Sequence, residues 1–140
     1  MCMLELGNLA SSLAPFNVSA VSVSLNANAQ EAGLVVTLEL FFAAISSLYF
    51  GTVAYKGKSL GLFGSLIVII CYYLCSIAEN IDQITIIKGF SGVGCGMLIA
   101  SGHSILASSY DPNRSYAIFT LFASITAALL IFISSTWIED

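Results

Sequence analysis

Charged residues are scarce in this chain, and the scarcity excludes most soluble folds. Only 9% of the 140 residues are charged, against about 25% in an ordinary globular domain. With four basic residues in all, a surface of the kind that binds nucleic acid is not expected. A soluble protein with 58% apolar residues and so few charges would expose large apolar patches and aggregate. The composition therefore favours a lipid bilayer as the solvent.

Residues that carry catalysis or bind metals are also few. The chain has one histidine and four cysteines, Cys2, Cys71, Cys75 and Cys95, all within apolar segments. Cys71 and Cys75 are neighbours on a helix, but no histidine lies near them, and we interpret the cysteines as small packing groups. The sequence contains no nucleophile–base pair and no loop that would cradle a phosphate. It predicts no enzyme, no metal site and no cofactor.

Long apolar runs are what the chain has in abundance. They predict an all-α integral membrane protein of about five transmembrane helices in a single membrane domain, residues 1–140. A helix needs about 20 apolar residues to span a bilayer. The predicted spans are 1–25, 34–55, 60–78, 84–108 and 115–137. The first is the weakest candidate, because it contains Glu5, Pro15 and several Asn and Ser residues, and 26–31 is expected to be an exposed loop.

The charges at the ends of these spans predict the orientation. Alternation places the loop with Lys56 and Lys58 on the same side as the loop with Arg114, and basic loops lie on the cytoplasmic side. The N-terminus is then cytoplasmic and the C-terminus lies on the outer side of the cell membrane, with the protein crossing it several times. The acids mostly fall on the outer face: Glu31, Glu79, Asp82, Glu139 and Asp140.

Two charges, Glu39 and Lys88, are predicted to lie inside the membrane, each about five residues from the outer end of its span. A lone ion at depth costs at least about 2.5 kcal/mol, so such residues usually face a cavity or each other. We expect that they pair, or that both border a substrate or proton pathway. The alternative is that Lys88 extends outward along its stem while Glu39 is protonated or packed. His103, fifteen residues after Lys88, is a further candidate for that pathway, although a single histidine near a helix end more often serves only as a hydrogen-bonding group.

Glycines are concentrated in the span 84–108. Each glycine costs a helix roughly 1 kcal/mol relative to alanine in water, but in a membrane it lets neighbouring helices approach closely. Gly92 and Gly96 begin a small-residue stripe with spacing of four, and Gly94 lies between them. These glycines are predicted to be helix-packing positions.

The order of these motifs resembles the N-terminal half of the major facilitator superfamily, over about residues 10–137. The segment KGFSGVGCG at 88–96, followed by DPNR at 111–114, is similar to the fourth helix and the loop after it. QEAG at 30–33 is similar to the entry of the second helix. GTVAYKGK at 51–58 occupies the place of the signature cytoplasmic loop. The chain departs from the family pattern where Lys88 replaces an arginine, and the antiporter Gly-Pro motif is missing from the span 115–137, which argues against a drug/proton antiporter.

The resemblance implies an incomplete six-helix bundle, about helices one to five, of a transporter in a bacterial inner membrane. It implies that the first and fourth helices line the substrate cavity, and that Gly51, Lys56, Lys58, Asp111 and Arg114 belong to cytoplasmic loop motifs. We therefore expect membrane transport of a small solute by a partial or truncated secondary transporter. Its partners would be the lipid bilayer, an unidentified small molecule, and the missing second half or another membrane protein. The alternative is a small integral-membrane interaction or assembly protein without transport activity of its own.

Overall fold

The computed structural model describes residues 28–53, 57–78 and 80–138, and this part of the chain is entirely α-helical. It contains four helices: α3 (Ala29–Val53), α4 (Gly57–Ser76), α5 (Ile81–Ala107) and α6 (Pro112–Ile138). They correspond to the last four predicted spans. The first predicted span, 1–25, lies outside the described residues, so four helices stand where five were predicted.

Three of the four helices are long and apolar enough to cross a membrane, over Gln30–Thr52, Ser59–Ser76 and Ile81–Ala107. The span predicted at 115–137 lies within α6, which is not among these three. That α6 crosses the membrane therefore stays a prediction.

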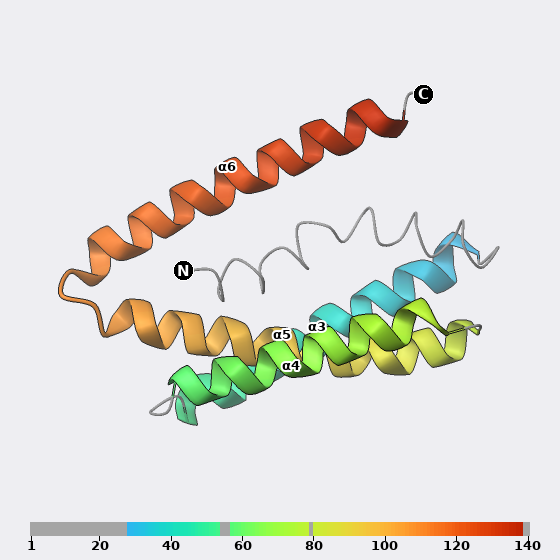
Figure 1. Ribbon diagram of the computed structural model, residues 1–140, viewed down its shortest axis with the longest axis horizontal. Helices are drawn as coiled ribbons and strands as arrows, with labels where there is room; N and C mark the ends of the chain where they lie inside the picture. Colours follow the sequence, from blue (N-terminus) through green and yellow to red (C-terminus); the bar gives the residue numbers. More distant parts are fainter. Residues whose placement is uncertain (1–27, 54–56, 79, 139–140) are drawn as a thin grey trace.

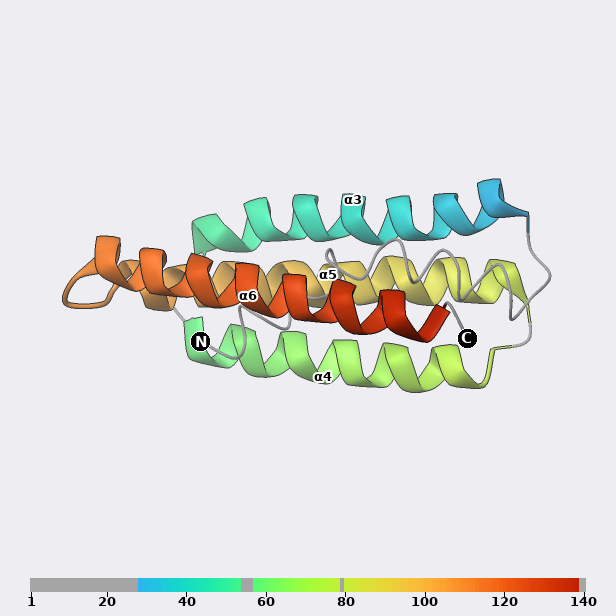
Figure 2. The ribbon, with the colours of Figure 1, turned by 90° about the horizontal axis from the view of Figure 1, so that it is seen from above.

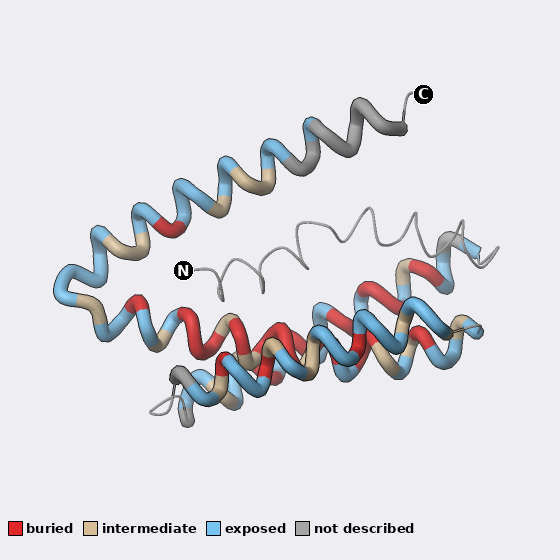
Figure 3. Tube along the Cα trace, viewed as in Figure 1, coloured by how far each residue is buried: buried red, intermediate tan, exposed pale blue. Residues whose placement is uncertain are grey.

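The helices α3, α4 and α5 form a bundle in which α5 is the central member. α5 packs along both α3 and α4 and lies between them (Figure 2). α3 and α5 run in the same direction, and α4 runs in the opposite one (Figure 2). Within the apolar windows, 67% of α5 is buried, against 28% of α3 and 17% of α4. Figure 3 shows the buried positions gathered on α5 and on the face of α3 towards it.

Small side chains fill the bundle core, and many large apolar side chains face outward. Ala32, Ala43, Cys95 and Ala100 are buried, while Leu48 is 74% and Phe90 64% exposed. This distribution would leave a soluble protein with extended apolar patches, but it fits helices that pack through small residues and face lipid.

α6 leaves the bundle at the end of α5 and diverges from it (Figure 1). Its contacts with α5 are concentrated near the turn that joins the two helices. Leu106 and Phe119 form a small buried cluster there, the Ser109 and Ser115 hydroxyls lie 2.8 Å apart, and the Tyr116 hydroxyl donates to the backbone carbonyl of His103 at 3.2 Å. These few contacts anchor the beginning of α6.

Capping groups determine where the helices begin. The Glu31 carboxylate accepts a hydrogen bond from the backbone N–H of Asn28, so α3 begins at Ala29, inside the segment predicted as a loop. The Asp111 carboxylate accepts the backbone N–H of Arg114, and Pro112 occupies the first position of α6, where its missing N–H costs nothing. The predicted loop boundary at 26–31 was therefore wrong by three residues.

Candidate functional site

The two charges predicted inside the membrane form an ion pair in the bundle core. The Nζ of Lys88 on α5 lies 3.2 Å from Oε2 and 3.4 Å from Oε1 of Glu39 on α3. Both side chains are almost fully buried, with 7% of Lys88 and 3% of Glu39 exposed. Lys88 therefore does not extend outward to the membrane surface, and of the alternatives considered the pairing is the one that the structure shows.

Two further side chains complete this charged cluster. The Ser91 hydroxyl donates to Oε1 of Glu39 at 3.1 Å, and the Lys88 Nζ lies 4.5 Å from the centre of the Tyr72 ring on α4. A cation over an aromatic face is stabilised by the ring quadrupole. Because Glu39, Lys88 and Tyr72 come from α3, α5 and α4, the cluster links all three helices of the bundle.

The cluster lies deeper in the helices than the sequence predicted. Glu39 is the tenth residue of the candidate span Gln30–Thr52, which places it roughly 14 Å along the helix from Gln30. The difference arises because α3 begins five residues before the predicted span. Throughout the described residues, every buried side-chain nitrogen and oxygen has a hydrogen-bond partner, so the charges are enclosed with their polar groups satisfied.

The predicted packing glycines lie where helix backbones touch. A Cβ on Gly92 would collide with the backbone oxygen of Glu39, and one on Gly96 would lie 2.5 Å from the backbone oxygen of Ala43. Gly94 faces α4 instead, where its Cβ would lie 3.0 Å from the backbone oxygen of Gly64. α5 thus has one glycine face towards α3 and another towards α4. The close approach of α3 to α5 brings the Glu39 carboxylate within hydrogen-bonding distance of Lys88.

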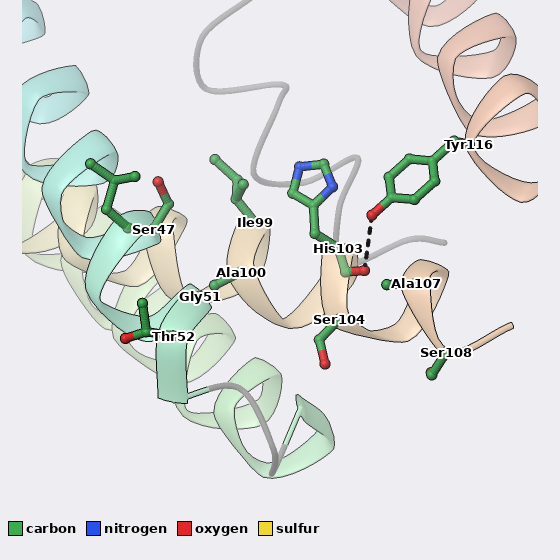
Figure 4. Close-up of a pocket in the computed structure, with 11 residues that line it drawn as sticks. Ser47, Gly51, Thr52, Ile99, Ala100, His103, Ser104, Ala107, Ser108 and Tyr116 are labelled. Carbon is green, nitrogen blue, oxygen red and sulfur yellow. Dashed lines mark hydrogen bonds between the residues drawn. The ribbon is translucent and has the colours of Figure 1, made fainter. Parts of the chain in front are cut away.

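A second candidate site lies at the end of the bundle where α3 and α5 finish. It is a pocket of ≈740 Å³ between these two helix ends and the beginning of α6 (Figure 4). α3 contributes its last turns, α5 its last third, and α6 one side chain. The lining residues are Ser47, Leu48, Gly51, Thr52, Ile99, Ala100, His103, Ser104, Ala107, Ser108 and Tyr116.

His103 and Tyr116 form the aromatic side of this pocket. Their rings stack with centroids 5.8 Å apart and planes 24° apart, and the Tyr116 hydroxyl bonds the His103 carbonyl (Figure 4). His103 is exposed. The imidazole of His103 therefore forms part of the pocket wall.

The structure divides the predicted site residues between these two places. Glu39 and Lys88 form the ion pair, and His103 and Gly51 line the pocket at the other half of the bundle. Asp111, just before α6, and Arg114, in its first turn, are exposed and do not line the pocket. Lys56 lies outside the described residues, and so does the side chain of Lys58. The roles of these residues in a transport pathway stay predictions.

Comparisons of the chain with models of known protein families, with characterised proteins and with solved structures find no match.

Several residues of both sites were not singled out from the sequence. Ser91 could have been found, because it lies three residues after Lys88 and so shares its helix face. Tyr72 and Tyr116 carried no such signal. Each reaches its site from a helix, α4 or α6, that carries none of the residues predicted at that site. Ser46, whose hydroxyl donates to the backbone oxygen of Val93 at 2.8 Å, is a further link between α3 and α5 that the sequence did not indicate.

Proposed function

We propose that these helices belong to a membrane transporter of a small solute, of the secondary-transporter type that the sequence resembles. The observation that carries this proposal is the ≈740 Å³ pocket lined by hydroxyl groups, His103 and Tyr116. Small-molecule sites in proteins commonly occupy ~300–1,000 Å³ and lie between the helices of bundles. Five of the eleven residues that line this pocket carry a hydroxyl group, and His103 adds an imidazole.

The position of α5 also supports the proposal. On the family resemblance α5 is the fourth helix, which lines the substrate cavity, and His103 and Ser104 on α5 are in the pocket lining. His103 is then a solute-contacting residue. Glu39 and Lys88 form a closed ion pair, which would join a substrate or proton pathway only in a conformation that separates them.

The same resemblance supplies the orientation that we propose. The end of α3, the start of α4 and the turn between α5 and α6 lie at the same end of the bundle (Figure 2). Arg114 in the first turn of α6 and the backbone of Lys58 in the first turn of α4 lie at that end, and we assign it to the cytoplasmic side by the rule for basic loops. The pocket would open towards the cytoplasm of a cell, in the inner membrane if the cell is bacterial. Family members close their cavity with a second half, so we expect these helices to act with further helices.

Labelling of a cysteine in the pocket tests the proposal, because a solute pathway must admit water. Cys2, Cys71, Cys75 and Cys95 are first replaced by serine or alanine, and Ala107→Cys is then compared with Leu62→Cys in proteoliposomes. Leu62 is 64% exposed on α4, near the same end of the bundle but outside the pocket. A membrane-impermeant thiol reagent is expected to react at least about tenfold faster at position 107, because the thiolate is the reactive form and is strongly disfavoured in lipid. Equal, slow reaction at both positions would count against a solute pathway.

The second candidate function is an interaction or assembly protein, and the position of α6 favours it. Beyond its anchored first turns, α6 stands away from the bundle, with Leu121 60% and Phe122 52% exposed. Such a helix could pack against another membrane protein. Slow reaction at position 107, together with crosslinking from α6 to a second polypeptide in the native membrane, would favour this candidate over transport.

A further inference from the structure

We infer that the exposed side of α5 binds one zwitterionic phospholipid, with an ammonium in its head group, in preference to an anionic phospholipid. The site consists of two apolar grooves that meet at Ile86 and of two carboxylates beyond one end of the first groove. The inference goes beyond the proposed function and holds whether or not the protein moves a solute.

The first groove lies between α3 and α5 and has a volume of ≈300 Å³. The Phe42 ring reaches Gly89 so closely that a Cβ there would lie 3.4 Å from it. Thr85 carries the only hydroxyl of the lining, and it donates to the carbonyl of Ile81 at 2.8 Å. The groove therefore offers apolar surface that suits an acyl chain. The lining residues are Leu38, Phe42, Thr85, Ile86, Gly89, Phe90 and Val93.

The second groove lies between the end of α4 and the beginning of α5 and has a volume of ≈330 Å³. Ile86 lines both grooves and is 63% exposed, so it stands between them. Two grooves on either side of one side chain match the two acyl chains of a single phospholipid. The lining residues of the second groove are Leu74, Ile77, Ala78, Gln83, Ile86 and Ile87.

Two exposed acids lie beyond the same end of the first groove. Glu31 is seven residues before Leu38 on α3, and Asp82 is seven residues before Gly89 on α5. Seven residues are almost two full helical turns, so each acid lies on the groove side of its helix, ~10 Å further along it. α3 and α5 begin at the same end of the bundle (Figure 2). A rise of this size is comparable with the head-group layer of a bilayer, about 5–8 Å on each side, so the acids lie at the level of the head group.

The other charges at this end leave the local field negative. The beginnings of α3 and α5 each contribute roughly half a positive charge, and the end of α4 contributes half a negative one, whereas each carboxylate contributes a full negative charge. The one basic residue of α5, Lys88, is paired with Glu39. The carboxylates therefore attract an ammonium, while the positive helix ends tolerate the phosphate of the same head group. An anionic lipid has the phosphate without the ammonium and is repelled.

Quenching of a tryptophan by brominated lipids tests the inference on the 140-residue chain in bilayers of dioleoylphosphatidylcholine. Trp137, the only tryptophan, is changed to phenylalanine, and Phe90→Trp places a reporter in the lining of the first groove. Phosphatidylethanolamine and phosphatidylglycerol with the same dibrominated chains are added at increasing mole fraction. Leu62→Trp is the control reporter, because Leu62 is 64% exposed on α4 and lines neither groove.

At position 90, phosphatidylethanolamine is expected to bind at least about threefold more tightly than phosphatidylglycerol, since the extra net charge of the latter meets two carboxylates. At position 62, phosphatidylethanolamine should have no such advantage. Equal binding of the two lipids at position 90, or tighter binding of phosphatidylglycerol there, would overturn the inference. Either result would leave the pocket at the other end of the bundle, and with it the proposed function, untouched.

A double variant tests the role of the acids. Glu31→Gln with Asp82→Asn removes both charges and keeps side chains of nearly the same size. The preference at position 90 should then fall to less than about 1.5-fold, because the repulsion of the anionic lipid is gone. Quenching at position 62 should stay as it was, which shows that the variant is still inserted and folded. An undiminished preference at position 90 would show that the carboxylates do not select the head group.

A pair of glycine variants tests the groove itself. Gly89→Leu places a branched side chain in the first groove, while Gly33→Leu is the matched control, since a Cβ on Gly33 meets no atom within 4 Å and Gly33 lines neither groove. Gly89→Leu should abolish the preference at position 90, and Gly33→Leu should retain it. A preference that survives Gly89→Leu would show that the lipid lies elsewhere and would contradict the inference.

Discussion

Lys88 on α5 and Glu39 on α3 form an ion pair of 3.2 Å inside the bundle, next to the point where the Gly92 backbone touches that of α3. The close backbone contact and the charge contact depend on each other. A larger residue at position 92 would move α3 away from α5 and lengthen the ion pair, which is short only because the helices are close.

The first prediction concerns the charge pair. Glu39→Ala leaves the buried ammonium of Lys88 without its partner, and the loss of one member of a buried pair costs about 3–5 kcal/mol. The measurement is the free energy of unfolding in detergent by denaturant titration. The exchanged variant Glu39→Lys with Lys88→Glu is expected to recover most of the stability that each single reversal loses. If the double variant is as unstable as the worse of the two single reversals, the pair does not stabilise the bundle directly.

The second prediction compares two glycines in helix interiors. Gly92→Ala introduces a Cβ that collides with the Glu39 backbone, and overpacking of this kind costs about 1–3 kcal/mol. Gly33→Ala is the matched control, because a Cβ there would find no atom within 4 Å. The control should be neutral or stabilising by up to about 1 kcal/mol, since alanine is the better helix former. Thermal unfolding of both variants in the same detergent tests this difference, and equal destabilisation would refute the close contact.

The third prediction concerns the anchor of α6. Phe119 is 6% exposed and packs against Leu106, so Phe119→Ala should loosen α6 while α3, α4 and α5 stay together. Hydrogen exchange by mass spectrometry should show faster exchange over 115–125 and unchanged exchange in α5 before residue 100. Phe122→Ala, at a position 52% exposed, is the control and should leave exchange unchanged. Faster exchange throughout the bundle would mean that α6 is part of the core.

The fourth prediction concerns the cap of α6. Asp111→Ala removes the acceptor for the backbone N–H of Arg114 and should destabilise the first turn by about 1 kcal/mol. Asp111→Asn keeps an acceptor and should retain most of that stability. Amide exchange in the first turn of α6 provides the comparison. Identical exchange in the two variants would show that the carboxylate does not cap this helix.

The sequence predicted the four described helices, and it gave pairing as one of two expectations for Glu39 and Lys88. Both follow from the cost of placing polar groups in lipid: long apolar runs predict spans, and two isolated charges in such runs predict a pair or a common polar pathway. The helix boundaries were less accurate. α5 begins at Ile81, not at 84, because the helix continues back to its N-cap Asn80, whereas a hydropathy pattern shows only where the apolar residues begin.

The pocket could not be predicted from the sequence, because it depends on the angle at which α6 leaves α5. Three local contacts near the turn anchor the start of α6, among them the stacking of Tyr116 on His103. Nothing in the helical pattern around Tyr116 distinguishes it from a residue that faces lipid. His103 was a candidate from its chemistry alone, but the hydroxyl groups of α3 that share its pocket, Ser47 and Thr52, were not.

The central claim is that water and solute, not lipid, reach one face of the last turns of α5, and a cysteine scan tests it most directly. His103, Ile105 and Ala107 are all exposed, but only His103 and Ala107 line the pocket. In the cysteine-free background, each is changed to cysteine and its rate of reaction with an impermeant thiol reagent is measured in proteoliposomes. The account predicts fast reaction at 103 and 107 and slow reaction at 105, between them. Equal rates at the three positions would contradict it.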